Sequence, residues 1–161
     1  MADLEETKKD QKSLLQLVSF KIGEEEFGVD ILSVQEINRM SQITKVPNTP
    51  DFIEGVINLR GRIVPVIDLR VKLGMTRKEH GKDTRIVVVE LKGKTMGFIV
   101  DEVNEVLRIS KDITEAPPDI VGGVNSEYIT SIGKLDDRLL ILLDLEKILS
   151  FSEFNLVEAT A

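Results

Sequence analysis

The sequence predicts a mostly β protein built as two tandem copies of one small barrel. Hydrophobic residues make up 42% of the chain but aromatic residues only 4%, and there is no tryptophan. Val, Ile and Leu therefore dominate the apolar positions, which favours strands over a helical bundle. Apolar runs of strand length alternate with turn residues along most of the chain. A block of the first half also recurs in the second half, which indicates a duplication.

Order is expected to begin at Leu14. Residues 1–13 are polar and charged without hydrophobic periodicity, which is typical of a disordered tail. In order, the pattern then predicts a strand at 15–22, a turn at 23–26, a short strand at 27–29, a helical turn at 31–34 capped by Asp30, extended segments at 35–39 and 43–46, and a turn at 47–50.

Residues 55–69 predict a tight hairpin. Two β-branched runs flank the turn pair Arg60-Gly61, and Gly61 can adopt the positive φ that a two-residue turn requires. Pro65 has no N–H, so the returning strand is expected at a sheet edge or with a bulge at that position. Asp68 then begins a capped helical turn that ends at Gly74.

The internal repeat covers three blocks in the same order. Residues 89–106 match 20–37 at a shift of 69, residues 118–124 match 50–56 at a shift of 68, and residues 138–145 match 62–69 at a shift of 76. The last shift is longer because Arg60-Gly61 corresponds to a longer segment at 131–137. A copy of about 65 residues is near the lower limit for a separate core, so two copies are expected to share one.

These observations give the predicted organisation of the chain. The first barrel is expected at about 14–75 and the second at about 84–150, with a charged loop at 77–83 between them. A second capped helical turn follows Asp144. Residues 151–161 are expected to form a C-terminal tail, frayed or with a short, weak helix.

Charge and composition exclude several classes of partner. Acidic residues outnumber basic ones by 28 to 21, giving a net charge of −7, so nucleic acid and anionic membranes are poor partners. No apolar run approaches the roughly 20 residues that span a bilayer, so no membrane insertion is expected. The N-terminus lacks the apolar segment of a signal peptide, and the chain has no cysteine. Both features favour a cytoplasmic protein.

The sequence offers no catalytic site. It has no phosphate-binding glycine loop and no nucleophile elbow. The single histidine, His80, lies in the charged loop without a second ligand at metal spacing. The carboxylates at 101–105 are not all kept in the first copy, where Leu32 and Ser33 stand, so a solvated face is the better interpretation. We therefore expect no enzymatic activity, no cofactor and no metal.

Two groups of residues are candidates for contact with a partner. Arg60 is either an ordinary surface arginine or a guanidinium whose rigid turn directs it at a carboxylate or at backbone carbonyls of a partner. Val34 and Ile37 either belong to the barrel core or present an apolar side chain outward. Both alternatives remain open at this point.

Three segments resemble the bacterial chemotaxis coupling protein family, the CheW family. They are 28–37 (GVDILSVQEI), 48–70 (NTPDFIEGVINLRGRIVPVIDLR) and 138–142 (RLLIL), within a similarity that runs from about Leu15 to Leu149. The resemblance implies a pair of five-stranded Src-homology-3-like barrels around a shared core. It also implies a scaffold without activity of its own, which links the cytoplasmic tips of chemoreceptors to the regulatory domain of the chemotaxis histidine kinase at membrane receptor arrays.

The resemblance further implies a receptor-facing groove between the barrels. Carried over by motif, its residues are Val34, Glu36, Ile37 and Arg60 from the first copy and Val103 and Val106 from the second. Residues that face the kinase are not assigned. A CheW-like adaptor in a two-component pathway other than chemotaxis is the alternative function.

Overall fold

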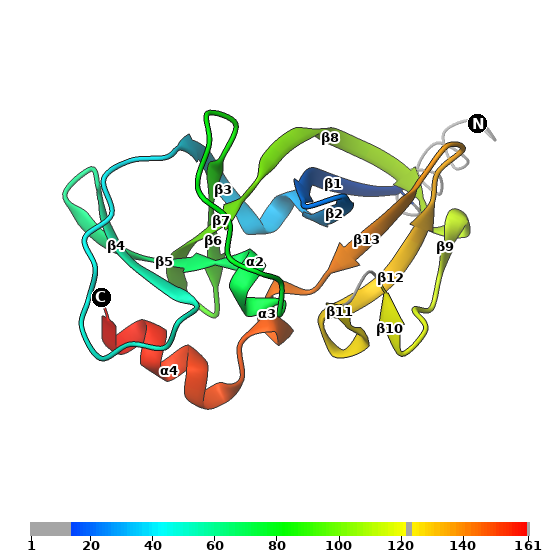
Figure 1. The fold of residues 1–161 in the computed structure, drawn as a ribbon. Helices are drawn as coiled ribbons and strands as arrows, with labels where there is room; N and C mark the ends of the chain where they lie inside the picture. Colours follow the sequence, from blue (N-terminus) through cyan, green and yellow to red (C-terminus); the bar gives the residue numbers. More distant parts are fainter. Residues whose placement is uncertain (1–13, 122–123, 161) are drawn as a thin grey trace, which may run out of the picture.

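Two β-sheets make up most of the molecule (Figure 1). The computed structural model describes residues 14–121 and 124–160, so the predicted tail at 1–13 lies outside the described residues. Sheet A has the spatial order β8 (Glu102–Ser110), β1 (Leu14–Ile22), β2 (Glu25–Asp30), β13 (Leu139–Leu143), β12 (Ile129–Lys134) and β9 (Thr114–Glu115). Sheet B has the order β3 (Val34–Arg39), β6 (Arg85–Leu91), β7 (Lys94–Val100), β5 (Arg62–Asp68) and β4 (Ile53–Leu59).

The remaining elements are short. A two-stranded sheet pairs β10 (Ile120–Val121) with β11 (Val124–Asn125). The helical elements are η1 (Ile31–Ser33), α2 (Leu69–Lys72), η2 (Lys111–Ile113), η3 (Ser126–Tyr128), α3 (Leu145–Ile148) and α4 (Phe151–Thr160). Among the described residues, no helix combines the length and the hydrophobicity that a membrane crossing requires.

The two repeats exchange strands. Sheet B contains β3, β4 and β5 from the first repeat but also the hairpin β6–β7 from the second, and sheet A contains the hairpin β1–β2 among strands of the second repeat. The sheets therefore do not follow the predicted division of the barrels at 14–75 and 84–150. The β1–β2 hairpin joins sheet A through the parallel pairing of β2 with β13. The β6–β7 hairpin joins sheet B through the parallel pairing of β7 with β5.

The strand pairing repeats residue by residue. Gly97 of β7 lies opposite Val66 of β5, and its repeat mate Gly28 of β2 lies opposite Leu142 of β13. A Cβ atom added at Gly97 would lie 2.7 Å from Ile86 Cγ2, so this position needs glycine for close packing. Five strands of sheet A thus correspond in order to the five strands of sheet B, and β9 is an additional strand of sheet A.

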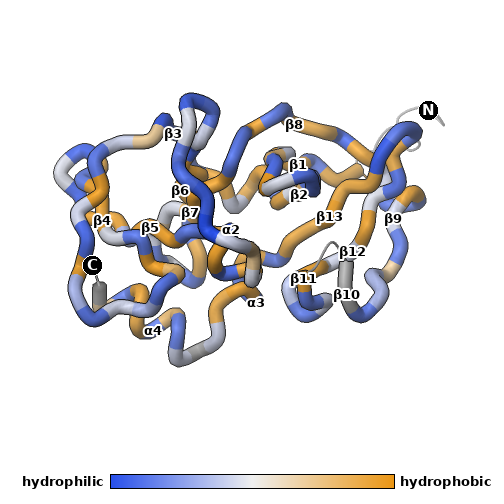
Figure 2. Tube along the Cα trace, in the orientation of Figure 1, coloured by the Kyte–Doolittle hydropathy of each residue, from blue (hydrophilic) through white to orange (hydrophobic). Residues whose placement is uncertain are grey.

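The hydrophobic core has three parts. The largest part lies between the sheets and contains Phe20 and Phe27 of sheet A together with Val89 and Phe98 of sheet B. The other two parts lie on the opposite faces of the sheets, one formed around Val88 in sheet B and the other around Leu17 and Leu140 in sheet A. Figure 2 shows hydrophobic positions along β5 and β13 and a hydrophilic loop between α2 and β6. The predicted shared core is therefore the core between the sheets.

The predicted hairpin is formed by β4 and β5, with Arg60 and Gly61 at φ values of 51° and 84°. Pro65 was expected at a sheet edge or at a bulge, and both expectations are wrong. Strand β5 lies inside sheet B, between β7 and β4. The register shift of the β4–β5 pair lies on β4, between Ile53 and Gly55. Pairing with β7 begins at Val66, so the missing N–H of Pro65 lies outside that ladder.

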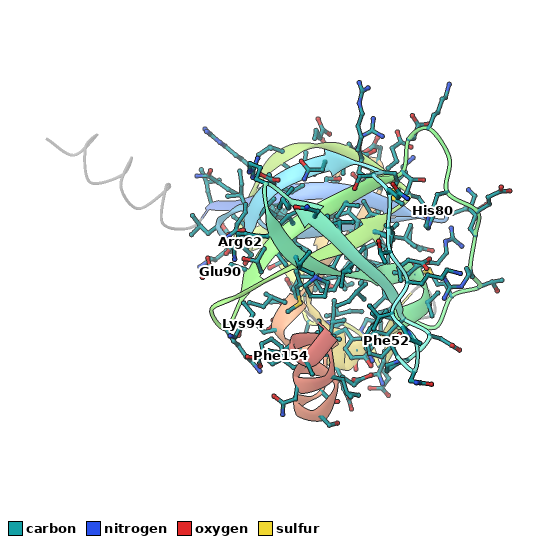
Figure 3. All side chains as sticks on the ribbon, turned by 90° about the vertical axis from the view of Figure 1, so that its left-hand side faces the viewer. Phe52, Arg62, His80, Glu90, Lys94 and Phe154 are labelled. Carbon is teal, nitrogen blue, oxygen red and sulfur yellow. The ribbon has the colours of Figure 1, made fainter. Side chains whose placement is uncertain are left out.

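The C-terminal segment forms the short helix that was one of the two expectations, and this helix packs into the core instead of extending as a tail. Phe154 and Val157 of α4 are buried in the cluster between the sheets. Lys72 Nζ lies 2.7 Å from Glu153 Oε2, and Lys94 Nζ lies 2.9 Å from Glu158 Oε1, so ion pairs connect the helix to the two repeats. Figure 3 shows Phe154 and Lys94 at this helix. Apolar burial of two helical residues explains why a weak helix former remains helical here.

Candidate functional site

Five of the six predicted site residues lie on two edge strands. Strand β3 is the edge of sheet B and carries Val34, Glu36 and Ile37, whereas β8 is the edge of sheet A and carries Val103 and Val106. The two strands are repeat mates, since β8 residues follow β3 residues at a shift of 69. Figure 1 shows that they leave the middle of the molecule in opposite directions.

A β-bulge places Val34 and Ile37 on the same face of β3. Val34 lies opposite Val89 and Ile37 lies opposite Val87, and both partners belong to the core between the sheets. Alternation alone would put residues three apart on opposite faces, but the register shift between Val34 and Glu36 adds one residue. Both apolar side chains therefore face the side of the shared core.

The same geometry recurs on β8. Val103 lies opposite Phe20 and Val106 lies opposite Val18, again in the core between the sheets, with the register shift between Ser19 and Phe20. The four apolar residues of β3 and β8 thus occupy equivalent positions. We call Val34, Ile37, Val103 and Val106 the apolar strip.

The inner and outer residues of the apolar strip differ in burial. Val34 and Val103 are partly buried and pack against the shared core. Ile37 is 39% exposed and Val106 is 54% exposed. Val34 and Ile37 were interpreted either as core residues or as outward-facing apolar side chains. The strip contains both kinds, because its inner members pack against the core and its outer members face solvent.

Glu36 and Arg60 lie on the other side of β3 and contact each other. Glu36 pairs with Val88, whose side chain belongs to the core on the opposite face of sheet B. Arg60 Nη2 donates to Glu36 Oε2, and Asn38 Nδ2 donates to Glu36 Oε1 at 2.8 Å. The hydrogen bonds from Arg60 and then Asn38 lower the pKa of the Glu36 carboxyl. The structure therefore separates this ion pair from the apolar strip.

Sheet A has a related polar cluster, joining residues of both repeats, that sequence reasoning missed. Arg138 Nε donates to Glu26 Oε2 at 2.5 Å, and Arg138 Nη2 lies 3.4 Å from Glu105 Oε1, where Glu105 is the repeat mate of Glu36. Ser19 and Asn104 also donate to Glu26. The sequence signal for this cluster was that Arg62 and Arg138 are repeat mates. In the structure Arg62 makes the equivalent contact, because it donates to Thr95, the repeat mate of Glu26.

His80 is not isolated, contrary to the expectation that it has no second ligand at metal spacing. Ligand atoms of Glu54, Asp68 and His80 all lie within 4.8 Å of one another. The same carboxylates face Arg77, whose Nη1 lies 2.6 Å from Glu54 Oε1 and 3.7 Å from Asp68 Oδ2. Burial raises the pKa of Asp68. Figure 3 shows His80 on its loop at the side of sheet B.

The predicted site residues lie apart from two cavities beside the loop that holds His80. One cavity of about 880 Å³ lies between the segment 40–54 and the loop 77–80, and another of about 330 Å³ lies on the other side of the same loop. Neither is lined by the apolar strip, by Glu36 or by Arg60. An open surface with exposed apolar side chains is typical of contact with another protein, whereas small molecules favour concave pockets.

The chain is similar to known proteins over most of its length. Residues 16–153 match the family model of the CheW-like domain. A chemotaxis protein CheW of Klebsiella aerogenes is 44% identical over 142 residues, which cover 88% of this chain and 86% of the relative. The CheW of Helicobacter pylori is 40% identical over 87% of this chain and 84% of the relative. The crystal structure of the scaffolding protein TtCheW from Thermoanaerobacter tengcongensis matches with a TM-score of 0.79 and 40% identity, over 86% of this chain and 90% of that chain.

Proposed function

The chain belongs to the CheW-like domain family, and from this premise we propose that it couples the cytoplasmic tips of chemoreceptors to the chemotaxis histidine kinase. It is a scaffold protein of chemotaxis. We further propose that it has no catalytic activity of its own and acts in the cytoplasm at membrane receptor arrays. The kinase would be bound through its regulatory domain.

The apolar strip is the observation that carries the receptor half of this proposal. Its four residues come from the edge strands of both sheets and share the face of the common core. Ile37 and Val106 leave apolar surface in contact with water, which favours burial against a partner. A receptor tip is a helical hairpin, and an amphipathic helix can place its apolar stripe on such a strip.

Arg60 would supply a polar contact on the side of β3 opposite the apolar strip, at the tip of the β4–β5 hairpin. Its guanidinium already donates to Glu36, but the side chain is 74% exposed. A guanidinium has five N–H donors, so donors remain for a receptor carboxylate or carbonyl. Glu36 would then act mainly by holding Arg60 in place.

The test is a reconstitution with purified components. The chain is mixed with a chemoreceptor signalling-tip fragment, with the regulatory domain of the histidine kinase, and with both. Each partner is expected to bind separately, and all three are expected to co-elute on size exclusion. Failure to bind either partner would contradict the proposal, and competition between them would show that coupling does not occur through separate surfaces.

A further inference from the structure

Each edge strand carries an arginine in the same position. The first repeat has Val34, Ile37 and Arg39 in the order V-x-x-I-x-R, and the second has Val103, Val106 and Arg108 in the order V-x-x-V-x-R. Arg39 is the last residue of β3, opposite Arg85. Arg108 lies opposite Gln16 near the end of β8.

These arginines extend the apolar strip. Side chains two residues apart in a strand share a face, so Arg39 lies on the face of Ile37 and Arg108 lies on the face of Val106. The register agrees, because no shift interrupts β3 after Glu36 or β8 after Glu105. Since β3 and β8 leave the middle of the molecule in opposite directions, the arginines lie at opposite ends of the strip (Figure 1).

Arg39 and Arg108 differ from the other arginines in having no partner within residues 14–121 and 124–160. The chain has eight arginines, and all of them lie within the described residues. Six donate to a side chain or to a backbone carbonyl: Arg60, Arg62, Arg70, Arg77, Arg85 and Arg138. Arg39 and Arg108 are exposed and make no hydrogen bond or ion pair with any described residue.

Two guanidinium groups thus flank the strip in a protein of net charge −7. Arg85, opposite Arg39, directs its guanidinium to the carbonyls of Lys82 and Thr84 and brings no carboxylate to the strip. Unpaired guanidinium groups beside exposed apolar side chains are suited to carboxylates of a partner, because the planar donor fork matches a carboxylate.

We propose that Arg39 and Arg108 select a helical partner segment whose apolar stripe is flanked at both ends by carboxylates. The inference rests on the proposed function, in which a receptor tip occupies the apolar strip. Each strand advances about 17 Å from its inner valine to its arginine, at about 3.3 Å per residue. Two such spans together equal the length of a helix of about 22 residues at 1.5 Å per residue, so a helical segment that contacts both arginines needs at least this length.

The experiment measures binding of the receptor signalling-tip fragment to the full chain and to Arg39→Ala, Arg108→Ala and the double variant. Each single change is expected to weaken binding about two- to five-fold, as for exposed ion pairs. The double variant is expected to lose about four- to twenty-five-fold, because distant sites act additively. Its binding should also depend less on salt than that of the native chain.

Two controls isolate the role of these arginines. Arg62→Ala removes the same charge from an exposed arginine off the strip and should leave receptor binding unchanged. A second receptor fragment, with the carboxylates flanking its apolar stripe changed to amides, should bind more weakly and respond no further to the arginine substitutions. The Arg39→Lys, Arg108→Lys double variant retains both charges but lacks the planar donor fork, so its affinity should lie between those of the native chain and the double alanine variant.

The outcomes separate this inference from the proposed function. If the native chain binds the fragment but the double alanine variant binds equally well, the inference is overturned and the receptor contact stands. An equal loss in Arg62→Ala would show a net-charge effect and overturn it as well. If the native chain fails to bind the fragment, the proposed function itself fails.

Discussion

Arg60 at the tip of the β4–β5 hairpin holds the carboxylate of Glu36 on β3, 24 residues earlier in the chain. The pair connects a turn to the edge strand of the same sheet, and the hydrogen bonds from Arg60 and Asn38 lower the pKa of Glu36. Two residues implied separately by family resemblance are therefore one structural unit. Their effects on a partner are expected to depend on each other.

A double-mutant cycle tests this dependence. Arg60→Ala should weaken binding of the receptor fragment about ten-fold, because a charge-assisted contact is lost. Glu36→Gln should weaken it less, and the double variant should match Arg60→Ala, since Glu36 acts by positioning Arg60. Calorimetric titrations give the affinities, and melting temperatures should stay within about 2 °C. Strictly additive losses would show that the two residues act independently.

The apolar strip gives a second prediction. Val106→Asp places a charge where an apolar stripe should be buried, so receptor binding should fall at least about ten-fold while kinase binding persists. Leu139→Asp is the matched control, because Leu139 is 57% exposed on β13, away from the strip. Titrations with both partners measure the effect. A similar loss of receptor binding in the control variant would contradict a role specific to the strip.

Gly55 is expected to be intolerant of any side chain. Its φ is 149°, and a Cβ atom would lie 2.2 Å from Thr44 O, where the backbone of residue 44 pairs with Val56. Gly55→Ala should lower the free energy of unfolding by about 2–4 kcal/mol. Gly81 is the control because a Cβ there meets nothing within 4 Å, and Gly81→Ala should change it by less than about 0.5 kcal/mol. Urea unfolding distinguishes the two, and equal stabilities would refute the steric argument.

Glu26 predicts a pH dependence of stability. Burial raises the pKa of this carboxyl, but hydrogen bonds from Ser19, Arg138 and Asn104 outweigh it, so the folded pKa lies below the ordinary value of 4.5. The unfolded chain therefore binds the proton first as pH falls. The stabilisation is present above pH 4.5 and is lost as pH falls through the lower folded pKa.

Glu26→Gln measures that contribution. At pH 7 the variant should be less stable by about 1–2 kcal/mol, because a hydrogen-bonded carboxylate is lost. The difference from the native chain should shrink in urea titrations below pH 4.5. Glu24→Gln is the control, since Glu24 is exposed in the turn of the same hairpin. A difference that stays constant from pH 7 to pH 3 would contradict the assignment.

The cluster of Glu54, Asp68 and His80 predicts no zinc binding. Arg77 already faces both carboxylates, so a divalent cation would have to displace a guanidinium. Calorimetry with zinc chloride should give no saturable heat for the native chain. Saturable binding that disappears in His80→Ala would contradict this expectation and show that the cluster takes a metal.

Local patterns were sufficient for much of the fold. The turn at Arg60-Gly61, the caps at Asp30, Asp68 and Asp144, and the shared core of two repeats were all predicted. Each depends on a few neighbouring residues or on a repeated pattern, which a single sequence displays directly. The edge position of Pro65 was predicted wrongly, because the neighbour of a strand depends on sheet order.

The sequence by itself determined most of the segments that form strands, that the pattern occurs twice, and which apolar residues are available in each copy. The extended segment expected at 43–46 is wrong, since only an isolated bridge from Thr44 to Val56 forms there. Only the tertiary structure decided that the hairpins β1–β2 and β6–β7 exchange between repeats, and that bulges turn Val34 with Ile37 and Val103 with Val106 onto one face. It also decided that Arg60 meets Glu36 on the other face. Strand partners and register are selected by burial of both faces at once, and that selection joins residues far apart in the chain.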